Sequence, residues 1–329
     1  MVLWLGLFLP IVGLVAFAVF FLWAVCMVLY FVRPQIFFYL IHRGLILKAG
    51  FSLKYVSMGD FRFSYIERGD GKKAEHVILM VHGFTGDKGV WCLMGSTLPK
   101  SYHLVAVDLP GHGYTTRKHH DDHSIPAQVA KLHQFVLAVG LDKRKFHLVG
   151  LSMGGFVAGV FATKYPSLLS SLVLMCPAGI NAPRISDFLM EIASGGKNYL
   201  LPKNPEDFRF MMKKVSHRNV FMPFFVVKII CETRKQAHDF YEKVLAEIAH
   251  PDQRWLLHNV LEDISVPTLT LWGDSDKILD VSAADIIAEK VKNVKVQILE
   301  RCGHAITFER PFKSAKLILQ FIRSLPRST

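Results

Sequence analysis

The first 32 residues contain no Asp, Glu, Lys or Arg, and only Gly6, Pro10 and Gly13 among them are not hydrophobic. A helix that crosses a bilayer needs about 20 apolar residues, and residues 11–32 provide such a run. Pro10 suits the first turn of that helix. We therefore predict an N-terminal transmembrane helix, with a membrane anchor over residues 1–33 and a span at about 11–32.

A cleaved signal peptide is the alternative interpretation of this segment. It would have a basic start and a shorter apolar core, and neither is present, although residues 24–26 (AVC) loosely resemble a cleavage site. The remainder of the chain carries all the charged residues, in a proportion typical of globular proteins. This composition excludes a disordered chain and a multi-span membrane protein.

Flanking charge predicts the orientation of the anchor. Arg33, Arg43, Lys48 and Lys54 follow the span, which places the C-terminal part in the cytosol by the positive-inside rule. The five cysteines form no C-x-x-C pair, which fits a reducing compartment. The basic residues behind the net charge of +12 form only short, scattered groups, and no nucleic-acid-binding motif accompanies them. We expect a single-pass protein whose basic surface faces the bilayer, on the cytosolic leaflet, and no nucleic-acid partner.

From residue 52 onward, apolar strand-like runs alternate with helical patterns. Continuous apolar strands between helices indicate an α/β fold with a mostly parallel central sheet covered on both faces. Ligands of such sheets bind at the carboxyl ends of the strands. An antiparallel hairpin at 54–57 and 61–67 precedes strands at 76–81, 104–107, 146–149, 172–176, 268–272 and 294–299, with helices at 127–139, 156–164, 283–291 and 313–323.

Residues 181–263 interrupt this alternation and are rich in Phe, Met, Lys and His. We interpret them as a helical cap insertion over the sheet, within a domain of residues 52–329. Phe221, Met222, Phe224 and Phe225 either contact lipid or pack as an ordinary amphipathic face of the cap insertion.

The strongest chemical signal is Gly150-Leu151-Ser152-Met153-Gly154, which fits G-x-S-x-G. It directly follows an apolar strand and opens a helix, the context that a nucleophile elbow requires. Glycines on either side of the serine permit a tight, strained turn. We predict Ser152 as a nucleophile.

A serine hydroxyl needs a base, and in this architecture the base comes last in the chain. His304 qualifies because it follows the last strand, in Cys302-Gly303-His304. Asp274, Asp276 and Asp280 all follow the strand at 268–272 and compete as the acid that orients the imidazole. We favour Asp276, in the turn leaving the strand, with Asp280 as the alternative.

An oxyanion hole should come from backbone N–H groups. One donor is the residue after the nucleophile, Met153, and the other is Phe84, in the loop His82-Gly83-Phe84. His82 reads as a structural hydrogen-bonding residue rather than a base. The polar run 119–123 (HHDDH) reads as a solvated turn rather than a metal site. No cofactor-binding motif is present, and none is expected to be needed.

With these residues in place, the chain resembles an α/β-hydrolase from about residue 52 to the end. The motifs are at residues 82–84, 108–113, 150–155, 273–280 and 302–304. Together with the apolar N-terminus and residues 115–117, 176–179 and 309–311, they resemble the membrane-anchored monoacylglycerol lipases of the abhydrolase-domain family, sixth-member type. The resemblance implies Ser152, Asp276 and His304 as a triad with Phe84 and Met153 as oxyanion donors. It also implies hydrolysis of monoacylglycerols such as 2-arachidonoylglycerol, with lysophospholipids as a further candidate lipid monoester substrate.

Two other functions remain open at this point. Hydrolases of carbon–carbon bonds in ring-cleavage products use the same residue types, but a membrane anchor argues against a soluble polar substrate. A non-catalytic, membrane-tethered binding protein on a hydrolase scaffold would usually have lost a triad residue, and none is lost here. An acyltransferase role is disfavoured because Glu309, not aspartate, is the fifth residue after His304.

Overall fold

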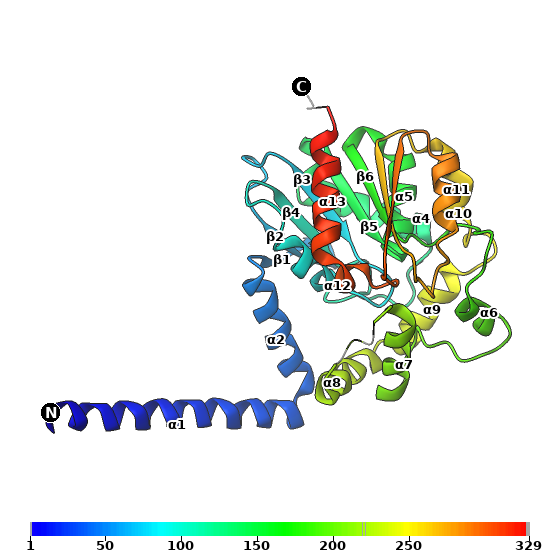
Figure 1. Ribbon diagram of the computed structural model, residues 1–329. Coiled ribbons are helices and arrows are strands. Elements are labelled where there is room, and N and C mark those ends of the chain that lie inside the picture. Colours follow the sequence, from blue (N-terminus) through cyan, green and yellow to red (C-terminus); the bar gives the residue numbers. More distant parts are fainter. Residues whose placement is uncertain (1, 219, 221, 327–329) are drawn as a thin grey trace.

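A computed structural model describes residues 2–218, 220 and 222–326 (Figure 1). Helix α1 (Val2–Val32) projects away from the body, and helix α2 (Pro34–Lys48) connects it to the first strand. The body is one layer of strands between helices, with a group of further helices below one edge (Figure 1).

The central sheet has eight strands in the order β1-β2-β4-β3-β5-β6-β7-β8. The pairs β1–β2 and β2–β4 are antiparallel, and all the other pairs are parallel. This arrangement confirms the predicted fold class. The strands are β1 (Ser52–Met58), β2 (Phe61–Arg68), β3 (Val77–Val81), β4 (His103–Val107), β5 (Phe146–Leu151), β6 (Leu169–Met175), β7 (Thr268–Gly273) and β8 (Val294–Leu299).

The inner strands are buried on both faces because helices cover each side of the sheet. Every residue of β3, β4 and β5 is buried, which explains why these strands are continuous apolar runs. Helices α3 and α13 contact each other, and α5 contacts both α4 and α10. These helices are α3 (Cys92–Gly95), α4 (Ile125–Ala138), α5 (Met153–Lys164), α10 (Leu256–Val260), α11 (Ala283–Lys290), α12 (Ile306–Glu309) and α13 (Pro311–Ser324).

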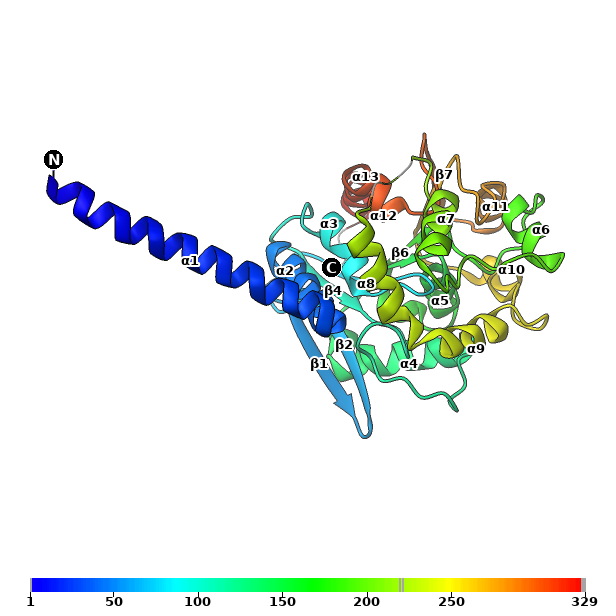
Figure 2. The ribbon, with the colours of Figure 1, turned by 90° about the horizontal axis from the view of Figure 1, so that it is seen from below.

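Between β6 and β7 the chain forms helices α6 (Asp187–Ala193), α7 (Pro205–Val215), α8 (Phe224–Lys235) and α9 (His238–Ile248), followed by α10. Seen from below, α7, α8 and α9 lie across the sheet edge (Figure 2). Helices α7 and α8 share a small core separate from the main one, with the buried members Phe208, Met211, Val227 and Cys231.

The candidate lipid-facing residues of the cap insertion divide into two groups. Met222 packs against the small core, so it follows the amphipathic-packing interpretation. Phe224 and Phe225 are exposed, at 55% and 46%. Phe221 lies outside the described residues.

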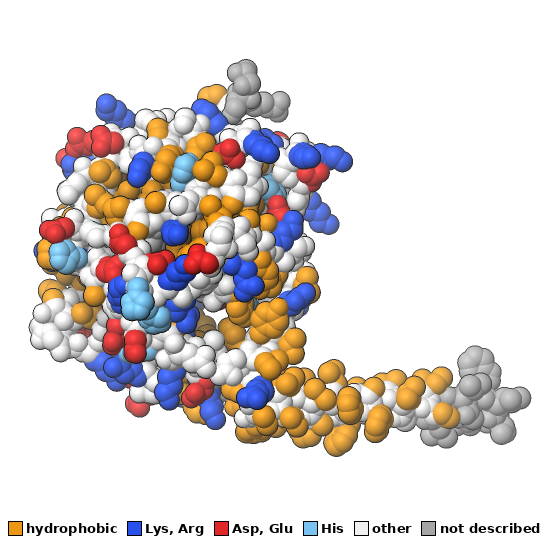
Figure 3. Space-filling model, turned by 180° about the vertical axis from the view of Figure 1, so that it is seen from behind, with side chains coloured by type: hydrophobic (Ala, Val, Ile, Leu, Met, Phe, Trp, Pro, Cys, Tyr) orange, Lys and Arg blue, Asp and Glu red, His pale blue; other side chains and the backbone are white. Residues whose placement is uncertain are grey.

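Helix α1 is long and apolar enough over Pro10–Val32 to cross a membrane, and no other described segment is. Hydrophobic side chains cover the coloured part of this helix, whereas both signs of charge cover the body (Figure 3). The expectation that Pro10 starts the helix is wrong, because α1 begins at Val2 and Pro10 lies inside it. Helix α2, which was not predicted, begins with Pro34, and its Lys48 lies in the last turn, where a cation is favourable.

Candidate active site

Ser152 stands at the turn between β5 and α5 with a φ of +54°, a strained value for a residue with a side chain. Its backbone is fixed by β6, since the Ser152 N–H donates to the Met175 carbonyl at 2.9 Å. Glycine is required on both sides. A Cβ at Gly150 would lie 2.3 Å from the Gly154 carbonyl oxygen, and one at Gly154 would lie 2.3 Å from the His82 carbonyl oxygen. The tight approach of strand, turn and helix therefore exposes the serine hydroxyl.

His304 and Asp276 meet Ser152 at the carboxyl ends of the parallel strands. The Ser152 Oγ donates to His304 Nε2 at 2.9 Å, and His304 Nδ1 donates to an Asp276 carboxylate oxygen at 2.7 Å. The Asp276 side chain is fully buried and that of His304 is 12% exposed. The structure thus brings together three residues from three separate strand ends, in the order that a base and its orienting acid require.

The structure also distinguishes the three competing carboxylates. Asp276 accepts from the Ile278 and Leu279 N–H groups with one oxygen, at 2.8 and 3.0 Å, and keeps the other oxygen for His304. Asp274 instead accepts from the Arg301 N–H at 2.9 Å and ties two loops together. The alternative acid, Asp280, accepts from the Ser282 N–H at 2.9 Å and from the Arg184 side chain. Only Asp276 among the three is hydrogen-bonded to His304.

Electrostatics suit His304 to the role of a base. Its burial alone would lower the pKa, but the charge and hydrogen bond of Asp276 outweigh burial and raise the pKa well above the ordinary 6.5. A buried carboxylate that stabilises the imidazolium makes the imidazole a stronger proton acceptor. The proton of Ser152 therefore has a defined destination.

The loop His82–Gly83–Phe84 lies against Ser152. A Cβ built on Gly83 would be 3.1 Å from the Ser152 Cβ and 3.6 Å from its Oγ. The next N–H along the chain is that of Phe84. Met153 is the first residue of α5, so its N–H has no carbonyl one turn before it within the helix. Both predicted oxyanion donors therefore lie on segments that border the serine hydroxyl.

His82 holds the loop that carries Phe84. Its Nε2 accepts from the Leu109 N–H at 3.0 Å, so the proton must be on Nδ1, which donates to the Gly83 carbonyl at 2.8 Å. Burial lowers the pKa of His82, which keeps the imidazole neutral and this tautomer in place. In a trans peptide the C=O and the following N–H point in opposite directions. Fixing the Gly83 carbonyl therefore fixes the direction of the Phe84 N–H.

Side chains that could together bind a metal ion also meet at this place. Among the described residues, one group of three ligand side chains comes within 4.8 Å, and it is Cys176, Asp276 and His304. Two of them already hydrogen-bond each other, and the Cys176 thiol donates to the His304 carbonyl at 3.5 Å. Burial raises the pKa of that thiol. The run 119–123 forms no such group in the described chain.

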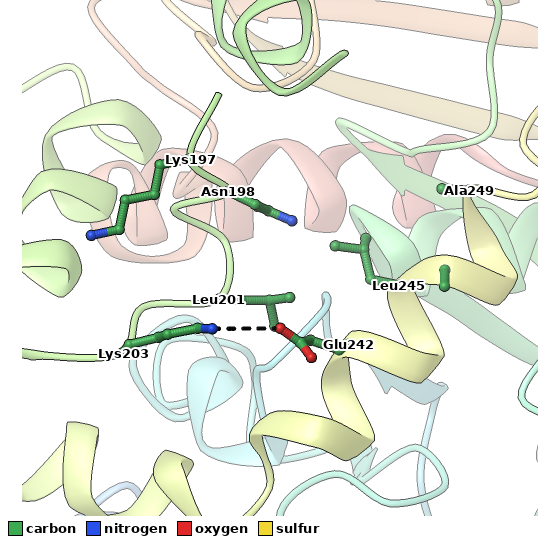
Figure 4. A pocket seen from close by; sticks show the side chains of 8 residues that line it. Lys197, Asn198, Leu201, Lys203, Glu242, Leu245 and Ala249 are labelled. Carbon is green, nitrogen blue, oxygen red and sulfur yellow. Dashed lines mark ion pairs between the residues drawn. The ribbon is translucent and has the colours of Figure 1, made fainter. Parts of the chain in front are cut away.

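Two hollows of the described surface lie in the cap insertion. One of about 490 Å³ is bounded by the segment 197–203 and by α9, where Lys203 and Glu242 form an ion pair at 3.9 Å (Figure 4). The other, of about 290 Å³, lies between α7 and α8. It is lined by Phe208, Arg209, Met212, Lys213, Val220, Met222 and Val227.

A parallel sheet with a serine on a nucleophile elbow defines the α/β hydrolases, and a family model agrees with the geometry. The chain belongs to the alpha/beta hydrolase family, whose model matches residues 78–316. Within that family it is similar to the human protein "Monoacylglycerol lipase ABHD6", with 42% identity over 84% of this chain and 83% of that protein. The resemblance inferred from the motifs is thereby confirmed.

Two bacterial relatives extend the comparison. "Lipase 1" of Psychrobacter immobilis is 31% identical over 71% of this chain and 73% of its own length. The crystal structure of a membrane phospholipase A, a bacterial virulence factor, superposes with a TM-score of 0.82 at 31% identity, over 96% of this chain and 97% of that one. All three relatives bear the names of lipid hydrolases.

Proposed function

We propose that this protein is a membrane-anchored serine hydrolase that cleaves the ester bond of monoacylglycerols, such as 2-arachidonoylglycerol, to fatty acid and glycerol. The observation that carries the proposal is the hydrogen-bonded series from Ser152 through His304 to the fully buried Asp276. The similarity to the human monoacylglycerol lipase supports the substrate class, and the similarity to a membrane phospholipase A supports lysophospholipids as a second one.

Each catalytic step has a residue to perform it. Ser152 Oγ attacks the acyl carbonyl while His304 Nε2 accepts its proton, and Asp276 stabilises the imidazolium that forms. The N–H groups of Phe84 and Met153 bind the developing oxyanion, each contributing about 3–4 kcal/mol to transition-state stabilisation. His304 then protonates the departing glycerol oxygen. Water, activated by the same imidazole, releases the fatty acid and restores Ser152.

The anchor suits a substrate that resides in the bilayer. We assign residues 1–33 to the membrane anchor and residues 52–329 to the hydrolase domain, with the cap insertion at 181–263. Arg33 and Arg43 just after the span support a cytosolic catalytic domain. Tethering raises the effective concentration of the enzyme at the surface where a long acyl chain partitions.

A fluorophosphonate probe tests the nucleophile directly. We expect the wild-type protein in detergent to be labelled and Ser152→Ala not to be labelled. Ser57→Ala, at an exposed position on β1, is the matched control and should be labelled like the wild type. Labelling that persists in Ser152→Ala would refute the assignment.

A substrate panel tests the chemistry. The wild type should hydrolyse monoacylglycerols faster than lysophosphatidylcholine, and should leave a vinylogous diketone acid, which requires carbon–carbon cleavage, intact. Preferential cleavage of the diketone acid would favour the carbon–carbon hydrolase. Silence toward every ester, including short p-nitrophenyl esters, would favour a non-catalytic binding protein.

A further inference from the structure

The cap insertion contacts the oxyanion loop in two ways: the Tyr241 ring of α9 makes an edge contact with the Phe84 ring, with centroids 5.9 Å apart, and one arginine hydrogen-bonds the loop backbone. Arg234, near the end of α8, donates from Nη2 to the Thr85 carbonyl at 3.0 Å, across 149 positions of sequence. Thr85 directly follows Phe84 and has a φ of +55°, in the left-handed region that side chains disfavour. A backbone held in that region needs contacts that over-determine it. The arginine supplies one of them.

An arginine at this position carries a cost in folding free energy. Its Nη1 is buried without a hydrogen-bond partner in the described chain, and no carboxylate forms an ion pair with it there. Its guanidinium lies over the ring of Phe208 at 5.4 Å, and burial lowers its pKa. Arg234 as a whole is half-buried, but its guanidinium end is removed from water, and a desolvated cation without an ion pair is costly. An apolar side chain of similar length would pack without that cost. The single strong bond that the arginine makes is the one to Thr85.

The loop is therefore held from two sides. From the sheet side, the His82 imidazole binds the Gly83 carbonyl at 2.8 Å. From the cap side, Arg234 binds the Thr85 carbonyl. The Gly83 carbonyl belongs to the same peptide unit as the Phe84 N–H, and the Thr85 carbonyl lies two peptide units further along the chain. Holding the loop on both sides of Phe84 leaves the Phe84 N–H little freedom to turn away from the reacting carbonyl.

We propose that Arg234 is a positioning residue, through which the cap insertion holds the Phe84 N–H in the direction that binds the oxyanion. This inference rests on the proposed function, since it assigns a role within the same reaction. It makes the rate of ester cleavage depend on a side chain that touches neither the substrate nor the triad.

Steady-state kinetics on a short, water-soluble ester separate positioning from substrate binding. Arg234→Met keeps the length and removes the donors. We expect kcat to fall about 10- to 100-fold, less than the loss of a whole oxyanion donor, with KM within about twofold of wild type. The Ki of an acyl trifluoromethyl ketone, which forms a tetrahedral adduct with an oxyanion, should rise by the same factor as kcat/KM falls. Arg234→Lys, which retains a single donor, should recover part of the rate.

Lys235→Met is the matched control, because Lys235 is exposed on the same helix. It should behave as the wild type. Rates are expressed per fluorophosphonate-labelled site, so that unfolded protein does not count. If Arg234→Met does not fold, Arg234→Lys decides: a lower kcat with a matching rise in Ki supports the proposal, and wild-type values overturn it.

A folded Arg234→Met variant with wild-type kcat and inhibitor affinity would overturn the positioning role. So would a variant in which only KM changes, since that indicates substrate binding instead. Failure of the proposed function looks different, because the wild-type protein itself would then turn over no ester.

Discussion

The sheet and the cap insertion are held together in different ways. The sheet lies within one continuous core that extends from β1 to α13, and all three triad residues stand on its strand ends. Helices α7 and α8 of the cap insertion have a small core of their own with four buried residues, whereas Phe240 and Val244 of α9 belong to the main core. The sheet therefore fixes the geometry of proton transfer, whereas α7 and α8 can adjust to a substrate at a smaller energetic cost.

Several polar contacts join the two regions near the site. Besides Arg234 with Thr85, the Ser186 hydroxyl donates to the Ile278 carbonyl at 2.8 Å, and the Ala305 N–H, next to His304, donates to the Val215 carbonyl at 2.8 Å. The His217 N–H donates to the Glu309 carboxylate at 3.0 Å, and the His217 ring bonds the Ser275 hydroxyl at 2.9 Å. Changes in the sheet should therefore affect chemistry or global stability. Changes in α7 and α8, whose core is separate, should affect rate without unfolding the sheet.

The largest effect is expected from Asp276→Asn. An asparagine cannot stabilise the imidazolium and favours the wrong His304 tautomer, so kcat should fall about 10⁴-fold while the protein stays folded. Stopped assays with radiolabelled monoacylglycerol are sensitive enough to measure the residual activity of the variant. The same change at Asp280 should cost less than tenfold, and equal losses at the two positions would contradict the assigned acid.

The same variant changes the pH profile. His304 must be neutral to accept the Ser152 proton, and Asp276 raises its pKa above 6.5. Wild-type kcat should therefore rise with pH through that raised pKa and be lost as the pH falls below it. Removing the carboxylate charge should move this acid limb to lower pH. A limb that stays in place in Asp276→Asn would show that another group titrates.

A smaller effect, on stability rather than chemistry, is expected from Lys88→Met. Lys88 and Asp108 form an ion pair at 2.6 Å with both side chains fully buried. Leaving Asp108 buried without its cation should lower the free energy of unfolding by about 3–5 kcal/mol. Denaturant unfolding measures this, and Lys88→Met combined with Asp108→Leu should recover much of the loss. Lys213→Met, on α7 of the cap insertion, should change the midpoint little.

Most of the fold could be predicted from the sequence, because the inner strands are buried on both faces and read as continuous apolar runs. The predicted bounds of helices were wrong or missing where the sequence has no such apolar run. Helix α5 begins at Met153 rather than at 156, because two glycines after the serine read as a turn. The helices of the cap insertion do not alternate with apolar strands that would mark where each begins and ends. Only the overall extent of the cap insertion was therefore predicted.

The site was predictable to the degree that it is local in the chain. Ser152 is marked by its glycines and His304 by its place after the last strand. Asp276 was one of three carboxylates within seven residues, and only the structure shows which one faces the imidazole. The hydrogen bond from Arg234 to Thr85 joins the end of a helix to a loop, and no sequence motif links the two residues. A single sequence contains no signal for it.

A moderate effect is expected from Gly83→Ala. The new Cβ would meet the Ser152 Cβ at 3.1 Å and the Leu151 carbonyl oxygen at 3.3 Å. Both belong to a strained turn that cannot yield easily, so the oxyanion loop should shift by a few tenths of an ångström. We expect kcat to fall about 10- to 100-fold with stability little changed. Gly44→Ala, where a Cβ meets nothing within 4 Å, should leave kcat unchanged.

The smallest effect concerns the other end of α8. Its Phe225 ring makes an edge contact with the Tyr30 ring of α1, with centroids 6.4 Å apart, and α8 also packs along α2. Helix α8 therefore hydrogen-bonds Thr85 near its C-terminal end and packs against α1 near its N-terminal end. Phe225→Ala should therefore lower kcat less than tenfold, by weakening the packing of α8 against α1, and Phe224→Ala, at the more exposed neighbouring position, should lower it less. In an Arg234→Met background the Phe225→Ala effect should vanish, since the hydrogen bond from α8 to the loop is already lost. Additive effects in the double variant would mean that Phe225 acts on the active site by another route.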